Sequence, residues 1–339
     1  MAVVTELPSA DGQDSDDVRP PHPIRSMLAR RIPLGFLSVF IASVIVYFST
    51  VVLPGDAATA ILGQSATPER LALLREQLGL NQSAVAGFWA WLRGLLHGDS
   101  GTSLSQGASV WSVVEPRLLN SIVLVVVTAL ISTALGFVLG AFAAYRRDGI
   151  FDTGSSVIAL VANALPEFVV GVFVVMLLSV NVFHWFPAIS ILPPGDQIWN
   201  QPDKLVLPVI TLVIVVTPYV FRMVRASMLE ALSSDYAEVA ELKGVSPIRL
   251  LFVHAFPNSL APTIQVVGLN LLYLAGGIVL VETVFQFPGI GLTLVGAIND
   301  RDIPMIQFIV VLLAVFYVVL NIATDVAVLL VTPRRRLPR

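Results

Sequence analysis

The sequence contains no cysteine and only two lysines, and both shortages limit what the chain can do. Without thiols it forms no disulfide and no thiolate zinc site, so the redox state of its compartment is left open. Neither lysine, Lys204 or Lys243, follows a glycine, whereas a Walker-type phosphate loop needs a Gly-Lys-Ser/Thr sequence. The chain therefore does not bind ATP through such a loop.

Patterns that are typical of active sites are also missing. The four histidines are scattered, with no pair at metal-ligand spacing. No Gly-x-Ser-x-Gly elbow occurs, and no two carboxylates lie close together in a plausible cleft. We therefore predict that the chain is not an enzyme and that it holds no cofactor or metal of its own.

Charged residues are scarce, at 13% of the 339 residues, whereas soluble proteins carry about 25%. Hydrophobic residues make up 56%, and the apolar runs are long enough to cross a bilayer. Internal prolines in the third and fourth runs are tolerated in membrane helices. The sequence predicts an all-α polytopic membrane protein with six transmembrane helices, at residues 32–53, 118–145, 154–183, 205–228, 261–283 and 306–331.

The positive charges predict the orientation of these helices. If both termini lie inside, fourteen of the twenty Lys and Arg residues fall on the cytosolic side and six on the outer side. This asymmetry favours a topology with both termini in the cytosol. The resulting organisation is a disordered cytosolic tail (1–30), a first transmembrane helix (31–53), an external helical subdomain (54–117), a transmembrane core (118–332) and a basic cytosolic tail (333–339).

The external subdomain is expected to contain two helical stretches. The first begins at Thr67-Pro68-Glu69, which is typical of a helix start. The second is an amphipathic stretch over residues 88–95 that ends at His97-Gly98-Asp99. Its tryptophans are expected to rest on the membrane surface.

Four polar side chains inside the predicted spans are candidates for lining a substrate path. Asn163 and Glu167 lie one helical turn apart in the third span, on either side of Pro166. A charge within a membrane is costly, so we favour a path-lining role for Glu167 over a carboxyl that is protonated or bonded to a neighbour. Asn270 and Glu282 belong to the fifth span. Bonding between helices is the simpler role for Asn270, and solvation at the outer surface is the simpler explanation of Glu282.

A polar hairpin at residues 233–257 separates the fourth and fifth spans. Asp235 is placed to cap a helix with Glu238 at its third position, and Gly244 is placed to close that helix in a left-handed conformation. Ser246-Pro247 is typical of the start of a second helix. The predicted topology puts the hairpin in the cytosol, where it is either a simple turn or a surface for docking another protein.

The same hairpin resembles a known signature. Glu238-Val239-Ala240, Gly244 and Phe256-Pro257 keep the spacing of the EAA motif of bacterial ABC-importer permeases, with departures at Val239, His254 and Phe256. The stretch 254–259 is similar to the variant in dipeptide and oligopeptide permeases. Further matches to that family, which together cover roughly residues 30–335, include Pro54-Gly55-Asp56, Gln77-Leu78-Gly79-Leu80-Asn81, the segment 91–99 and Phe287-Pro288-Gly289-Ile290-Gly291.

The resemblance implies a multi-pass permease subunit of an ATP-driven importer in the bacterial cell membrane, most simply for di- or oligopeptides. The partners it implies are a second homologous permease, two ABC ATPase domains or subunits that bind ATP and Mg²⁺, and an external substrate-binding protein. The lipid bilayer surrounds the chain, and nucleic acid is not a partner. The hairpin would contain the coupling helix, with small Ala240 permitting close approach of the ATPase and Gly244 permitting the turn. The residues expected to dock are Asp235, Tyr236, Glu238, Ala240, Glu241, Gly244 and Arg249.

Other functions stay open at this point. An importer of the same class could carry a nickel chelate, haem or glutathione. A secondary transporter driven by ions would need a charge relay inside the membrane, for which Glu167 alone is thin support. A membrane receptor would use the external subdomain to bind its ligand.

Overall fold

The computed structural model describes residues 23–52, 67–69, 83–193, 195–246 and 249–331. Within these ranges the chain is helical, and its only β-type pairing is an isolated bridge between Thr102 and Ser109. Four helices are each long and apolar enough to cross a membrane. They are α1 (Pro23–Val52), α5 (Val110–Tyr145), α8 (Asp203–Leu232) and α13 (Ile303–Val331). A further long helix, α11 (Phe256–Phe285), is bent. The shorter α-helices are α4 (Ala84–Leu96), α6 (Ile150–Ala164), α7 (Glu167–Val175), α9 (Asp235–Leu242) and α12 (Ile290–Asn299). The chain also contains a 3₁₀ turn (Ile198–Asn200) and two π-helical segments, η2 (Met176–Asn181) and η4 (Leu250–Ala255).

Two of the predicted spans are bent. The predicted third span is sharply broken at its internal proline, because α6 and the helix that runs from α7 into η2 meet at 103°. The break falls at Leu165 and Pro166, because proline cannot continue the hydrogen bonding of α6 and restricts the residue before it. The two parts of α11 meet at 50°. The all-α polytopic fold is confirmed; the described residues contain six spans if each bent pair counts as one, and the orientation stays a prediction.

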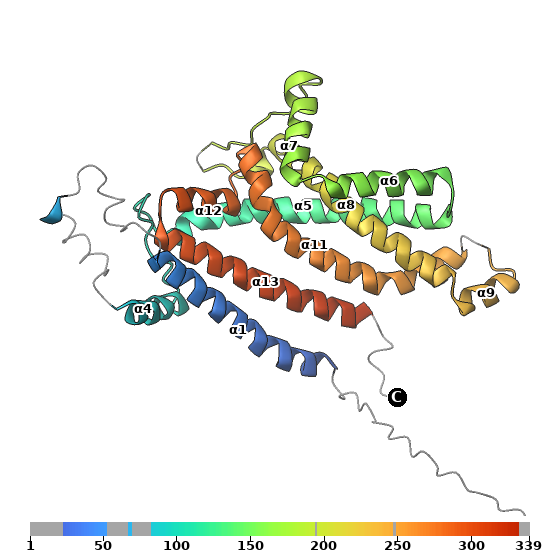
Figure 1. Cartoon of the computed structure of the whole chain (residues 1–339), viewed down its shortest axis with the longest axis horizontal. Helices are drawn as coiled ribbons and strands as arrows, with labels where there is room; N and C mark the ends of the chain where they lie inside the picture. Colours follow the sequence, from blue (N-terminus) through green and yellow to red (C-terminus); the bar gives the residue numbers. More distant parts are fainter. Residues whose placement is uncertain (1–22, 53–66, 70–82, 194, 247–248, 332–339) are drawn as a thin grey trace, which may run out of the picture.

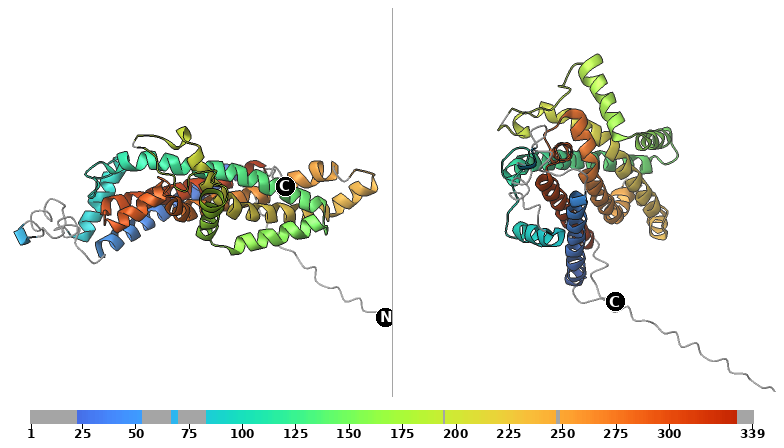
Figure 2. Two further views of the ribbon diagram at one scale, coloured as in Figure 1. Left: turned by 90° about the horizontal axis from the view of Figure 1, so that it is seen from above. Right: turned by 60° about the vertical axis from the view of Figure 1, so that its left-hand side comes forward.

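The long helices lie side by side in an elongated bundle (Figure 1). α9, the start of α1 and the end of α13 lie toward one end of the bundle, and α4 and α12 lie toward the other. α7 leaves the bundle steeply, as the right-hand view of Figure 2 also shows. The arrangement places α9 at the same end as the start of α1 and the end of α13, as the predicted topology requires.

Close packing between α5 and α8 depends on two glycines one turn apart. A Cβ atom at Gly136 would lie 2.6 Å from the Cβ of Val220, and one at Gly140 would lie 2.8 Å from the backbone oxygen of Phe221. Small residues at this spacing let two membrane helices approach closely. The main core is a separate cluster that is built from α5, α7, α8 and α11 and includes Leu124, Leu212, Leu274, Ile278 and Phe285.

Several predicted boundaries move in the structure. α1 begins at Pro23, so residues 23–30 are helical and do not belong to a disordered tail. α5 begins at Val110, so the last part of the predicted external subdomain is the start of a long helix. The predicted amphipathic stretch is confirmed as α4, where Phe88 is 3% exposed and packs edge-on against Phe40 and Tyr47 of α1. The segments 1–22, 53–66, 70–82 and 332–339, which include most of the first external stretch and both tails, lie outside the described residues.

Candidate coupling hairpin and substrate path

The hairpin begins with a serine that stays bonded to α8. The Ser234 carbonyl accepts hydrogen bonds from the amides of Ala237 (2.9 Å) and Glu238 (3.2 Å), while its hydroxyl donates to the carbonyl of Ala231 (2.5 Å). Asp235 is therefore the first residue of α9, and the prediction that it caps this helix with Glu238 at the third position is wrong by one residue. Asp235 and Glu238 instead place two carboxylates in the first turn, where the helix dipole favours negative charge.

Gly244 closes α9 as predicted. Its φ is +79°, in the left-handed region, and the amide of Val245 donates to the carbonyl of Ala240 at 3.1 Å. A bond across six residues around a left-handed glycine is the Schellman arrangement, which satisfies a carbonyl at the end of a helix. No atom lies within 4 Å of a Cβ placed on Gly244, so the glycine is required by the backbone conformation and not by crowding.

The inner face of α9 is filled by small side chains. Ala237 is 1% exposed and Ala240 is 8% exposed, and both pack with Leu250 of η4. Ala240 therefore packs inside the hairpin, and the expectation that its small size lets an ATPase approach stays a prediction. Its small size lets α9 lie close to η4.

The outer face of α9 carries two apolar side chains that reasoning from the sequence missed. Val239 is 49% exposed and Leu242 is 82% exposed, and Asp235, Glu238 and Arg249 are exposed around the same hairpin. Val239 and Leu242 are three residues apart and share a helix face, so this spacing was the available signal. The side chains of Tyr236 and Glu241, which were also expected to dock, lie outside the described residues.

The second arm of the hairpin runs directly into a span. Pro247 and Ile248 lie outside the described residues, but the amide of Leu250 bonds to the carbonyl of Ser246 at 2.9 Å. From Leu250 the chain continues through η4 into α11 without a break. α9 is therefore connected to α8 through Ser234 and to α11 through η4.

The bend between α6 and α7 separates two of the predicted path residues. α6 ends at Ala164, so Asn163 and Glu167 do not share one face of a continuous helix, and that expectation is wrong. Glu167 begins α7, and its Oε1 accepts a hydrogen bond from the hydroxyl of Tyr273 on α11 at 2.7 Å. It lies against Gly277, where a Cβ would come within 2.6 Å of that oxygen.

A groove of about 690 Å³ lies between α6, α8 and α11. Asn270 lines it, is 8% exposed, and its Nδ2 has no hydrogen-bond partner among the described residues. The simpler role predicted for Asn270 was a hydrogen bond between helices, and the Nδ2 of Asn270 makes no such bond among the described residues. The groove is lined by Ser156, Leu160, Tyr219, Arg222, Met223, Arg225, Ala226, Val266, Leu269 and Asn270.

The environment of Glu282 differs from the one predicted from the sequence. Its side chain is 0% exposed, so the expected solvated carboxylate is wrong, and a residue with no exposed surface does not line an open path in this structure. Its carboxylate accepts hydrogen bonds from the hydroxyl of Ser121 (2.5 Å) and the amide of Leu292 (2.9 Å). Glycines at 289 and 291 leave room for it. Glu282 therefore joins α5, α11 and the start of α12.

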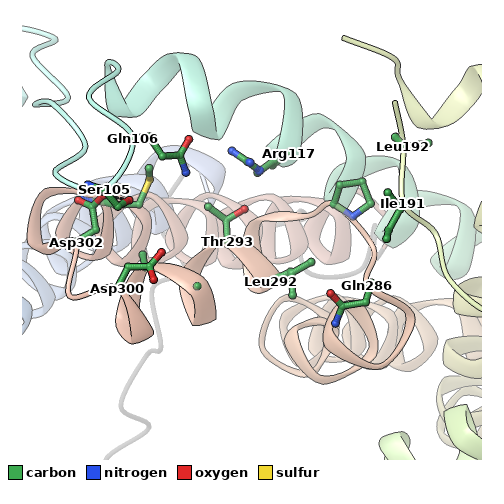
Figure 3. Close-up of a pocket in the computed structure, with 14 residues that line it drawn as sticks. Ser105, Gln106, Arg117, Ile191, Leu192, Gln286, Leu292, Thr293, Asp300 and Asp302 are labelled. Carbon is green, nitrogen blue, oxygen red and sulfur yellow. Dashed lines mark hydrogen bonds between the residues drawn. The ribbon is translucent and has the colours of Figure 1, made fainter. Parts of the chain in front are cut away.

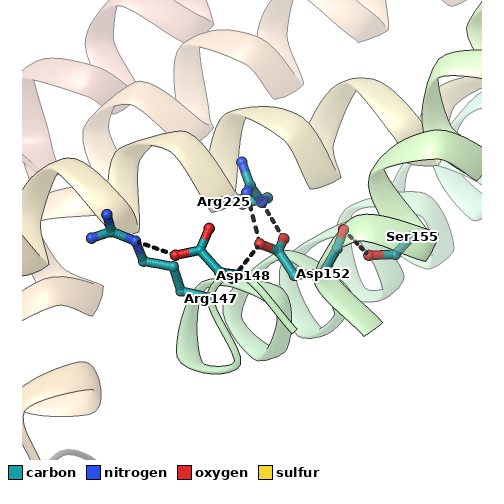
Figure 4. Close-up of polar contacts among 5 residues, drawn as sticks. All are labelled: Arg147, Asp148, Asp152, Ser155 and Arg225. Atoms are coloured by element: carbon teal, nitrogen blue, oxygen red, sulfur yellow. Dashed lines mark hydrogen bonds and ion pairs between the residues drawn. The ribbon is translucent and has the colours of Figure 1, made fainter. Parts of the chain in front are cut away.

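A buried ion pair that the sequence did not indicate connects α6 to α8. The guanidinium of Arg225 contacts both carboxylate oxygens of Asp152, with Nη2 at 2.8 Å from Oδ2 (Figure 4). Asp152 is 2% exposed and also accepts the amide of Asp148 at 3.1 Å. Asp152 is in the first turn of α6, next to the turn between α5 and α6, where Arg147 and Asp148 form a second, exposed pair. The buried pair holds the start of α6 against α8.

A second cavity, of about 340 Å³, opens at the end of the bundle that holds α12. Figure 3 shows Arg117 of α5, Thr293 of α12 and Asp300 around it. At its edge, Asp302 caps α13 through the amide of Met305 (3.3 Å) and accepts hydrogen bonds from the hydroxyls of Ser103 and Ser105. Burial by itself raises the pKa of the Asp302 carboxyl, but the hydrogen bonds outweigh it and hold the pKa below its usual value.

Replacing Asp302 with asparagine is expected to destabilise the protein at neutral pH but not in acid. Because the folded state lowers the pKa, the carboxylate contributes its full stability above about pH 4, where the unfolded chain titrates. That stability is lost as the pH falls through the lower folded-state pKa. We expect Asp302→Asn to cost about 1.5–3 kcal/mol at neutral pH, the usual effect of hydrogen bonds to a charged group. Thermal denaturation in detergent across the acid range measures it. Asp300→Asn, an exposed neighbour, is the control, and a stability gap that persists unchanged in acid would contradict the assignment.

Comparisons with known proteins agree with this arrangement. The family described as binding-protein-dependent transport system inner membrane component matches residues 136–337, and the N-terminal part of that component matches residues 24–125. A probable peptide ABC transporter permease of Sinorhizobium fredii is 34% identical over 309 residues, covering 91% of this chain and 98% of that protein. The dipeptide transport system permease DppB of Escherichia coli K12 is 31% identical over 336 residues, again covering 91% of this chain and 98% of its own.

One solved structure shows the fold. A chain of the MetNI methionine ABC transporter, in an inward-facing conformation, superposes with a TM-score of 0.51 at 18% identity, covering 64% of this chain and 94% of that chain. The family is a membrane part of transport systems, a non-catalytic role. The chain therefore belongs to the family of binding-protein-dependent transport system inner membrane components, as a multi-pass permease of the bacterial inner membrane.

Proposed function

We propose that this chain is one permease subunit of an ATP-driven importer for di- or oligopeptides. It forms the translocation path together with a second, homologous permease. Two ABC ATPase domains or subunits bind ATP and Mg²⁺ and supply the energy, while an external binding protein delivers the peptide. The names of the relatives, a peptide permease and a dipeptide permease at 34% and 31% identity over nine-tenths of the chain, support the peptide cargo.

The outer face of α9 is the observation that carries the proposal. It presents Val239 and Leu242 to solvent beside the carboxylates of Asp235 and Glu238, on a helix closed by the left-handed Gly244. Exposed apolar side chains with charges around them are typical of a surface that binds another protein. An ATPase that closes on ATP would press on this helix.

Movement of α9 reaches the path through its two attachments. Ser234 bonds α9 to the end of α8, and η4 continues into α11. α8 and α11 are the helices that carry Arg222 and Asn270, two of the residues around the groove. A rigid-body shift of α9 would therefore open or close the space between α6, α8 and α11, which is how a switch between inward- and outward-facing states is produced.

Purification of the complete transporter tests the proposal. The chain would be co-expressed with its second permease and ATPases, placed in proteoliposomes, and supplied with binding protein. We expect peptide-loaded binding protein to stimulate ATP hydrolysis and peptide uptake above the level with empty binding protein. Stimulation only by a nickel chelate, haem or glutathione would overturn the peptide cargo. Uptake that continues without ATP while a proton gradient is held would overturn the ATP-driven mechanism.

A further inference from the structure

We propose that the groove between α6, α8 and α11 binds the cargo in passage. Arg222, which lines the groove, takes the peptide carboxylate, and Glu167, which lies beyond the groove lining at the start of α7, takes the ammonium group. This inference rests on the proposed peptide cargo and adds the residues that recognise it. The two charges are joined by a row of two tyrosines, Tyr219 and Tyr273.

The row of side chains that joins Arg222 to Glu167 runs from α8 through α11 to α7. Arg222 and Tyr219 both line the groove and lie three residues apart on one face of α8. The ring of Tyr219 lies 6.2 Å from that of Tyr273 on α11, and the hydroxyl of Tyr273 donates to Glu167 of α7 at 2.7 Å. Both tyrosines are about two-fifths exposed, at 39% and 41%, so their faces are open to a ligand.

The charges at the two ends are not neutralised by the chain itself. Arg225, the other arginine of the groove, is occupied by the carboxylate of Asp152. Arg222 has no carboxylate partner among the described residues, and within the same ranges Glu167 has no cationic partner and is bonded only to Tyr273. A cation and an anion separated by two aromatic rings match the two termini of an extended peptide.

Two polar atoms along the groove also lack partners. Asn270 is 8% exposed, and its Nδ2 has no hydrogen bond in the described part of the chain. Ser156, on the α6 wall, likewise has a buried hydroxyl without a partner there. A buried polar group without a hydrogen bond is costly, so these groups are suited to a ligand with amide groups. Peptide carbonyls and amides satisfy both.

The remaining lining suits peptide side chains of varied size. Leu160, Met223, Ala226, Val266 and Leu269 form apolar walls, and the volume of about 690 Å³ lies within the range of ligand sites. Methionine adapts to ligands of different shape, which suits a path that accepts many sequences. The two termini are the only charged groups that all peptides share. In the row of four side chains, the charged groups available to bind them are Arg222 and Glu167.

Uptake of end-blocked peptides tests the assignment in the complete transporter. Arg222→Gln is expected to lower uptake of a peptide with a free carboxyl terminus by about tenfold, the usual effect of losing one charge-assisted hydrogen bond. The same variant should leave uptake of the C-terminally amidated peptide at its wild-type level. Glu167→Gln should do the reverse: it lowers uptake of peptides with a free amino group and spares the N-acetylated peptide. Each rate is divided by the wild-type rate for the same peptide, so the preference of the binding protein cancels.

Two controls separate this inference from the proposed function. Arg93→Gln and Glu115→Gln remove exposed charges on α4 and α5, outside the groove, and should transport every peptide normally. Binding-protein-stimulated ATP hydrolysis should persist in Arg222→Gln and Glu167→Gln, because α9 is intact. Normal uptake in both groove variants, or equal loss for free and blocked peptides, would overturn the groove assignment. Failure of the wild-type transporter to take up any peptide would overturn the cargo itself.

The absence of cysteine allows a direct test of occupancy. Ala226→Cys places the only thiol of this chain in the groove, and Glu230→Cys places one a turn further along α8, outside it. During turnover with peptide-loaded binding protein, maleimide labelling at position 226 should slow at least about threefold relative to empty binding protein, as expected for a site occupied most of the time. Labelling at position 230 should not change. Equal labelling rates with and without peptide at position 226 would overturn the proposal.

Discussion

Replacing Gly244 with valine is expected to abolish cargo-stimulated ATP hydrolysis and uptake while the protein still inserts into the membrane. The φ of +79° is strained for any residue with a Cβ, by about 1–2 kcal/mol, and more for a β-branched one. Since no atom lies within 4 Å of the added Cβ, the effect is a change of the turn and not a steric clash. The Schellman bond from Val245 to Ala240 is lost, and α9 no longer presents Val239 and Leu242 in one fixed orientation.

Matched variants show whether the backbone conformation is the cause. Gly244→Asn should keep most of the coupling, because asparagine tolerates the left-handed region. Gly154→Val adds the same side chain to α6, where the added Cβ also meets no atom within 4 Å and φ is not positive, and it should transport normally. ATP hydrolysis by the reconstituted transporter, with and without loaded binding protein, measures the result. Wild-type stimulation in Gly244→Val would show that α9 is not the coupling element.

Replacing Asp152 with alanine is expected to destabilise the folded protein by about 3 kcal/mol, at the lower end of the cost of breaking a buried ion pair. Asp152 is 2% exposed, whereas the side chain of Arg225 is 29% exposed and can recover some hydration. The variant leaves the guanidinium without its acceptor and also frees the amide of Asp148. Thermal unfolding in detergent measures the loss, which should appear as a lower melting temperature.

A double replacement distinguishes a broken pair from lost packing. Asp152→Ala with Arg225→Leu removes both charges and should recover part of the stability that Asp152→Ala loses, because no unpartnered charge remains. Asp148→Ala is the control: its pair with Arg147 is exposed, at 84% for the Asp148 side chain, and such pairs contribute at most about 1 kcal/mol. Equal destabilisation by Asp152→Ala and Asp148→Ala would contradict the role of the buried pair.

The sequence predicted those features that depend on local pattern. Apolar runs of spanning length predicted an all-α membrane protein, because a bilayer requires every backbone group to be bonded within the helix. Gly244 was correctly expected in a left-handed conformation, because a helix end followed by Ser-Pro leaves few alternatives for a glycine. The spaced match around Glu238 and Gly244 indicated the family, which the comparisons confirmed.

Features that depend on which faces meet were not predictable in this way. A helical repeat cannot say that Ala240 faces inward and Leu242 outward, since that depends on where Leu250 lies. Neither can it show that Glu282 is enclosed by Ser121 and Leu292, or that Asp152 meets Arg225 across 73 positions of sequence. Pro166 marked a break in the third span, but the angle of 103° follows from the packing of α7 against α8 and α11.

The sequence by itself therefore determined the class of protein, its helical spans and the position of the turn at Gly244, because each follows from hydropathy or from the backbone preferences of a few neighbouring residues. Only the tertiary structure decided which polar groups meet. It enclosed Glu282, matched Arg225 with Asp152, placed Arg222 and Asn270 along an open groove, and bonded Glu167 to Tyr273. The physical reason is that the cost of a buried charge depends on its neighbours in space, and these come from helices far apart in the chain.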